Sequence, residues 1–175
     1  MGHAGEVTLP FPEPTRHASS LNEVFADYLD FFRSRVLAKA EGLPRSELRL
    51  SRLPSGWTPL QLLKHLTFVE LRWLEWGFEG REVADPWGAL KVDRWDVPAD
   101  ETVEQLAAAL RKQGEHSRRV IGTHRLAEVG QPGPRWDGAE PPTLERILLH
   151  LVQEYARHLG HLDIVAELID GTQGE

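Results

Sequence analysis

The sequence predicts an all-α fold, a four-helix bundle, from three observations. Four segments of roughly twenty to thirty residues carry apolar side chains at helical spacing. Glycine, proline and capping residues separate these segments. No segment shows the alternation of apolar and polar residues that is typical of a half-buried strand. Helices with one apolar side each bury those sides against one another, so a bundle is expected.

The first helix is expected over about residues 20–40. Gly42 and Pro44 follow it and are typical of a helix end. Its apolar residues recur at helical spacing: Leu21, Val24, Phe25, Tyr28, Phe31, Phe32 and Leu37.

The second helix has the clearest start. Thr58 is expected as its N-cap, Pro59 occupies the first helical position, and Gln61 can complete a capping box. The helix is expected to end near Gly80. His65 shares a stripe with apolar residues, so the sequence places His65 on the core side.

The third helix is expected over about residues 101–126. Its middle, "RKQGEHSRR", is polar and contains Gly114, so it is expected to be exposed or kinked there. Before it lies a connection over about residues 81–99. A second connection, "AEVGQPGPRWDGAEPP", follows the helix. Both connections between helices are long enough to be functional.

The fourth helix is the longest. Thr143 is expected to cap its start with the side-chain hydroxyl. Gly171 follows Asp170 where a left-handed residue is expected to end the helix. No proline interrupts the segment between them.

Length and composition limit the classes of function. A chain of 175 residues allows one domain with a real core. We expect a partly flexible N-terminal arm at residues 1–18, the bundle at 19–171 and a tail at 172–175. A net charge of −7 argues against nucleic acid and anionic membrane as partners, because both require clustered basic surface.

The absence of cysteine excludes thiolate metal ligands and a cysteine nucleophile. Any thiol chemistry therefore needs a thiol supplied from outside the chain. No apolar run reaches transmembrane length, and the N-terminus has no apolar signal core. A cytoplasmic location is therefore expected.

Four ionisable residues gather on one side of the fourth helix. At about 100° per residue, Glu154, His158 and His161 all lie within about 80° of His150. Apolar residues occupy the same sector, so this stripe lies on or beside the core face. Charges there cost several kcal/mol unless they are paired or bound to a metal. Either a metal or catalytic site or a hydrogen-bonded structural cluster explains the stripe.

Metal sites in bundles are built from inward-facing side chains on facing helices. Glu154 and His158 project side by side, and His65 can complete the set from the second helix. Two histidines and one glutamate with an open position are typical of a catalytic metal site, best matched by zinc, with nickel or iron as alternatives. His161 can orient a ligand or move a proton. His150 is the alternative third ligand.

The remaining histidines are expected in solvent: His3, His17, His116 and His124. Of the six tryptophans, most are expected in the core. Trp87, Trp95 and Trp136 lie in the long connections instead, where they can cover the mouth of a pocket.

The sequence resembles the DinB superfamily, which includes YfiT-like proteins and mycothiol- and bacillithiol-dependent thiol transferases. The resemblance covers nearly the whole chain and rests on "GWTPLQLLKHL" and "EYARHLGH" in their order and helix placement. In that family one histidine of the second helix and an i, i+4 pair on the last helix bind a divalent metal. His65, Glu154 and His158 match these positions. Many members carry histidine where this chain has Glu154, a departure similar to the mycothiol-dependent maleylpyruvate isomerase branch.

The resemblance implies a metal-dependent thiol S-transferase. In such an enzyme the metal activates a low-molecular-weight thiol of the mycothiol type, which attacks a small electrophile, and His161 is the expected catalytic residue. The resemblance also implies a homodimer. Two alternatives stay open: a metal-dependent hydrolase, and a non-catalytic metal-binding or interaction bundle.

Overall fold

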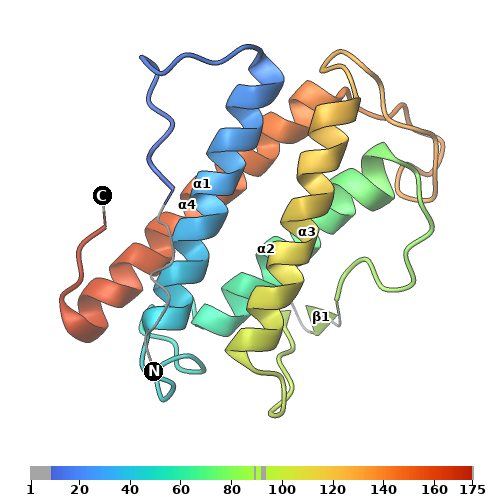
Figure 1. Ribbon diagram of the computed structural model, residues 1–175. Helices are drawn as coiled ribbons and strands as arrows, with labels where there is room; N and C mark the ends of the chain where they lie inside the picture. The colour runs from blue at the N-terminus through green and yellow to red at the C-terminus, as the bar shows by residue number, and fades with distance from the viewer. Residues whose placement is uncertain (1–8, 89, 92–93, 175) are drawn as a thin grey trace.

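The computed structural model describes residues 9–88, 90–91 and 94–174, and its four long helices pack as a bundle (Figure 1). The predicted all-α fold is confirmed. The long helices are α1 (Leu21–Gly42), α2 (Pro59–Trp73), α3 (Val103–Thr123) and α4 (Leu144–Asp170). A π-helical turn, η1 (Leu74–Phe78), continues α2. Part of the predicted flexible arm, residues 1–8, lies outside the described residues.

Two short strands in the connection between α2 and α3 were not predicted. β1 (Leu90–Lys91) pairs with β2 (Arg94–Trp95) in an antiparallel arrangement. Each strand has two residues, which is too short for an alternating pattern to be visible in the sequence. No helix in the described part of the chain is both long and apolar enough to cross a membrane.

Local capping signals position the starts of the helices. The predicted capping box of Thr58 and Gln61 is confirmed at the start of α2. A second box, Thr102 with Gln105, begins α3 close to the expected position. The predicted hydroxyl cap of α4 is wrong, because the Thr143 side chain makes no capping hydrogen bond. Its backbone carbonyl instead accepts from the fourth residue along the helix, so the helix begins there without a side-chain cap.

The ends of the helices also follow local chemistry. Gly171 ends α4 with φ 79°, the left-handed conformation that was predicted. Gly80 follows η1 with φ 64°, close to the expected end of the second helix. Inside η1, the carbonyl of Gly77 accepts a hydrogen bond of 2.9 Å from the indole Nε1 of Trp136. That bond ties the connection before α4 to the end of α2.

The apolar core lies between the inward faces of the four helices. Every helix contributes leucines that are at most 1% exposed, among them Leu29 in α1, Leu63 in α2, Leu110 in α3 and Leu151 in α4. Burial of a leucine side chain stabilises the fold by about 1.5–3 kcal/mol. This core packs α2 against α4, so that polar side chains on the facing sides of the two helices can interact.

A polar network is buried inside this core. Glu70 of α2 is fully buried and accepts hydrogen bonds from Arg33 of α1, at 2.9 and 3.0 Å. It also accepts from the hydroxyls of Ser117 in α3 and Tyr155 in α4. Arg33 donates further to Asp30 at 2.6 Å. One carboxylate therefore joins all four helices.

The polar middle of α3 is exposed on one side only, whereas the prediction had it exposed or kinked. Gln113 and Ser117 are buried there. Gly114 allows α3 to approach α1, since a Cβ atom at this position would lie 2.5 Å from Nε of Arg33. The predicted exposure is wrong for these residues because their polar side chains face the buried network.

Replacement of Gly114 by alanine is expected to destabilise the protein by about 1–3 kcal/mol. The added methyl group would displace the Arg33 guanidinium from its carboxylate partner. Gly122→Ala is the matched control in the same helix, because no atom lies within 4 Å of its Cβ position. We expect this control to be neutral or to stabilise by up to about 1 kcal/mol. Urea unfolding of both variants measures the difference, and equal stability would contradict the expectation.

Candidate metal centre

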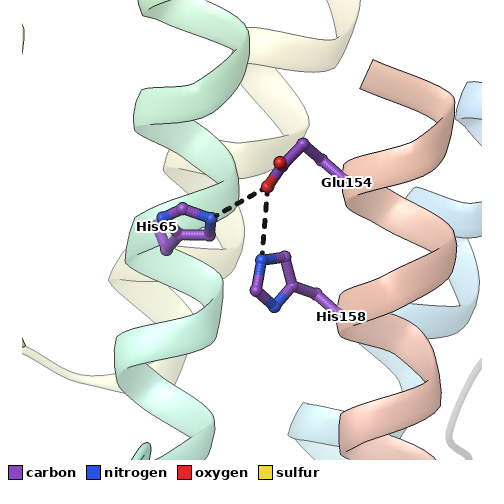
Figure 2. A group of neighbouring side chains, drawn as sticks. All are labelled: His65, Glu154 and His158. Atoms are coloured by element: carbon purple, nitrogen blue, oxygen red, sulfur yellow. Dashed lines mark hydrogen bonds and ion pairs between the residues drawn. The ribbon is translucent and has the colours of Figure 1, made fainter. Parts of the chain in front are cut away.

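Figure 2 shows three side chains from two helices that point toward one another: His65 of α2 and Glu154 and His158 of α4. The Nε2 atoms of His65 and His158 each lie 3.3 Å from Oε2 of Glu154. One ligand atom from each residue lies within 4.8 Å of the other two. The three residues predicted from distant parts of the sequence therefore form one cluster, called the triad below.

The spacing and chemistry of the triad fit a divalent metal. Bonds of about 2.0–2.2 Å to a tetrahedral ion place its ligand atoms about 3.3–3.5 Å apart. Both distances of 3.3 Å in the triad agree with this separation. Imidazole and carboxylate ligands suit zinc, and also nickel and iron. Three protein ligands leave a further position for a substrate or water.

The electrostatics of the triad also favour metal binding. Its side chains are only 10–16% exposed. Burial lowers the pKa of His65, which favours the neutral imidazole that a metal requires. Hydrogen bonds from His158 and then from His65 hold the pKa of Glu154 well below its usual range. At neutral pH the cluster thus contains a carboxylate ready to bind a cation.

Tryptophan rings enclose the triad. The centroid of the Trp57 ring lies 5.5 Å from that of His65 and 6.2 Å from that of His158. Trp95 lies 5.6 Å from His65 and is 3% exposed. Its backbone carbonyl accepts from Gln61 at 3.1 Å, which anchors the connection over α2. Of the loop tryptophans singled out in the sequence, Trp95 therefore forms a wall of the candidate site.

His150 and His161 flank the triad on α4. Nε2 of His150 lies 3.7 Å from Oε1 of Glu154, and its ring packs at 4.6 Å against Trp73. His161 lies beside His158, with ring centroids 5.5 Å apart. Since the group of ligand atoms contains His65 and neither flanking residue, the geometry favours His65 over His150 as the third ligand.

The other histidines are spread over the molecule. His17 is exposed, as predicted, and His3 lies outside the described residues. The prediction that His116 is solvated is wrong, because it is 8% exposed and its Nε2 lies 2.7 Å from Oε2 of Glu79. His124 is half-buried and contacts Glu128 at 2.9 Å. Both partners are carboxylates, so these histidines belong to local ion pairs away from the triad.

A cavity of about 600 Å³ lies at the start of α4, and its lining includes no residue of the triad. Its lining includes His150, Trp73 and Trp136. A volume of this size suits a small-molecule ligand. His150 both lines the cavity and approaches Glu154, so it connects the cavity to the triad.

Arg72 is a buried residue near the site that the sequence-based candidates did not include. It follows His65 by seven residues, which is about two helical turns and brings it back to the same side of α2. The same periodicity that placed His65 on the core side could have identified it. Of the ionisable residues on that stripe, only His65 was named as a candidate from the sequence.

Comparison with known proteins supports the family and the fold. A family model described as Mycothiol-S-transferase matches residues 24–171, a range that contains the whole triad. The crystal structure of a conserved protein from Enterococcus faecalis is similar, with a TM-score of 0.58 and 15% identity. The match covers 89% of this chain and 100% of that chain, and at this identity it bears on the fold alone. The comparison with curated proteins finds no match.

Proposed function

This chain belongs to the mycothiol-S-transferase family, of the DinB/YfiT-like type, and we propose that it is a divalent-metal-dependent thiol S-transferase. In the proposed reaction a low-molecular-weight thiol of the mycothiol type gives its proton to His161, and the thiolate sulfur forms a bond to a carbon of a small electrophile. In a substitution the bond from that carbon to the leaving group breaks and the leaving group departs with the electron pair; in an addition the π bond of the electrophile breaks and its other end takes up the proton. The observation that carries the proposal is the triad, whose ligand atoms lie within 4.8 Å of one another.

Each triad residue has a defined task in this proposal. His65 and His158 would each supply an imidazole nitrogen, and Glu154 would supply one negative charge that compensates the cation. Zinc fits this set best, with nickel or iron as alternatives. A divalent ion at this position lowers the pKa of a thiol that binds it, which favours the nucleophilic thiolate. The rings of Trp57 and Trp95 pack against His65 and limit the access of water to the triad.

We assign proton transfer to His161. Burial, and next the electrostatic effect of the neighbouring His158, lower the pKa of His161. Its imidazole is therefore neutral at physiological pH and can accept the thiol proton on a ring nitrogen. Its ring lies beside that of His158, with centroids 5.5 Å apart, so it is close enough to the triad for this role.

Replacement of His158 by alanine tests the proposed function. We expect thiol transfer from mycothiol to a chromogenic electrophile to fall by about 100-fold or more, because the cation would lose one of three protein ligands. His124→Ala is the matched control, since this histidine pairs with Glu128 away from the triad. Initial rates of thiol transfer by the wild type and both variants measure this difference. Full activity in His158→Ala would exclude the proposed mechanism.

A further inference from the structure

Arg72 is a buried cation that makes no hydrogen bond or ion pair with a carboxylate among the residues that the structure describes. It is 7% exposed, and its Nη1 atom makes no hydrogen bond. The guanidinium instead lies over two tryptophan rings, 4.4 Å from the centroid of Trp87 and 5.2 Å from that of Trp95. Ring faces attract a cation but cannot accept its directed N–H bonds as a carboxylate does.

The other buried lysine and arginine residues of the described chain are paired. Arg33 contacts Glu70 at 2.9 Å. Lys64 contacts Glu101 at 2.8 Å. Buried charges are ordinarily paired or bound to a ligand, because removal from water is costly. Arg72 departs from the pattern that this same protein follows elsewhere.

Arg135 is a second cation of the same kind, from the connection between α3 and α4. Its Nε atom is buried and makes no hydrogen bond. Its guanidinium lies 4.2 Å from the centroid of Trp73, and it also covers Trp76 and Trp136 at 5.3 and 5.1 Å. Burial, and next the charge of Arg135, lower the pKa of Arg72 to about 10, against the opposing effect of the Glu154 carboxylate, so Arg72 stays charged at neutral pH.

These two arginines lie beside the triad. Trp95 contacts both the His65 ring and the Arg72 guanidinium. Trp73 contacts both His150 and Arg135, and it lines the cavity of about 600 Å³ described above. Trp95 thus links Arg72 to the triad, and Trp73 links Arg135 to the cavity.

We propose that Arg72 and Arg135 bind a carboxylate group of a substrate beside the triad. This inference rests on the proposed thiol-transfer function, because it names the chemical class of the molecule that enters the same site. A guanidinium presents a planar fork of N–H donors that matches the two oxygens of a carboxylate. The tryptophan rings supply apolar faces for the rest of the ligand.

The charge balance of the site also favours a negatively charged ligand. A divalent cation on the triad would retain one net positive charge after compensation by Glu154. Two arginines without carboxylate partners among the described residues add to that charge. A carboxylate on the electrophile would lower the electrostatic energy of the site.

The first test is direct binding of benzoate, with benzamide as the uncharged analogue of the same shape. Several tryptophans surround the arginines, so quenching of intrinsic fluorescence reports binding without any need for turnover. We expect benzoate to bind wild type at least about tenfold more tightly than benzamide. Arg72→Met and Arg135→Met are expected to abolish this preference. Arg157→Met removes an exposed arginine and is expected to retain it.

Three results would overturn the inference. Equal affinity for benzoate and benzamide in wild type is the first, and an unchanged preference in both arginine variants is the second. The third is a preference for benzoate that is lost in His158→Ala but kept in the arginine variants. That result would mean that the carboxylate binds the metal ion of the triad and not the arginines. Should Arg72→Met fail to fold, Arg135→Met carries the test, because its half-buried side chain lies in a connection.

Kinetics then identify the substrate that carries the carboxylate. With mycothiol as the thiol, 4-chloro-3-nitrobenzoate and 4-chloro-3-nitrobenzamide are compared as electrophiles. An increase of KM in Arg72→Met that is confined to the benzoate assigns the carboxylate to the electrophile, and an equal increase for benzoate and benzamide would contradict that assignment. Arginine-dependent benzoate binding without any thiol transfer would contradict the proposed function but leave the carboxylate site in place.

Discussion

Purified wild-type protein is expected to contain close to one equivalent of a divalent metal, and His65→Ala is expected to lose it. His65 lies on α2, remote in sequence from Glu154 and His158, and its Nε2 atom is 3.3 Å from the carboxylate of Glu154. Loss of one of three protein ligands lowers metal affinity by at least about 10–100-fold. Plasma mass spectrometry of protein purified without a histidine tag measures the metal content and its identity.

His150→Ala is the matched control for this measurement. His150 lies on the same helix stripe, but its ring nitrogen is 3.7 Å from Glu154 and outside the triad. We expect this variant to keep its metal. If His65→Ala keeps its metal and His150→Ala loses it, then His150 is the third ligand and His65 is not. Wild type that neither contains metal nor takes it up would leave the triad as a hydrogen-bonded cluster of the core.

Replacement of Glu70 by alanine is expected to lower the free energy of unfolding by about 3–5 kcal/mol. The change leaves the Arg33 guanidinium buried without its carboxylate, and removes the acceptor of the Ser117 and Tyr155 hydroxyls. A domain of this size has a total stability of about 5–15 kcal/mol, so the loss is a large fraction of it. Urea unfolding followed by circular dichroism measures the change.

Glu104→Ala is the control for the loss of a surface carboxylate. Glu104 pairs with Arg45, and both side chains are more than half exposed. Exposed ion pairs contribute at most about 1 kcal/mol, so little change is expected. A second variant, Arg33→Met with Glu70→Leu, replaces the buried charges by apolar groups and is expected to recover part of the stability. Equal stability of Glu70→Ala and Glu104→Ala would contradict the role assigned to the network.

Local sequence signals predicted the helices well. The Thr58–Gln61 box and the left-handed Gly171 were both identified because the residues that form them are at most a few positions apart. Helical periodicity also placed His65, Glu154 and His158 on inward faces. Those faces limited which side chains could meet between two helices, so the triad was accessible from the sequence.

The same reasoning failed where polarity was taken as exposure. The segment around Gly114 is polar, yet it faces Arg33 and Glu70 in the core. A side chain that is buried because it has a partner looks the same in sequence as one that is solvated. His116 was misplaced for this reason, since its partner Glu79 lies 37 positions away.

The sequence by itself determined the four helices, the side of each helix that faces inward and the residue types available to a metal. Only the tertiary structure decided that His65 rather than His150 completes the triad, that Glu70 joins all four helices, and that Arg72 lies beside the site without a carboxylate partner among the described residues. Periodicity and caps are set by neighbours along the chain. The identity of a partner from another helix depends on how the helices pack, and that packing is a property of the whole core.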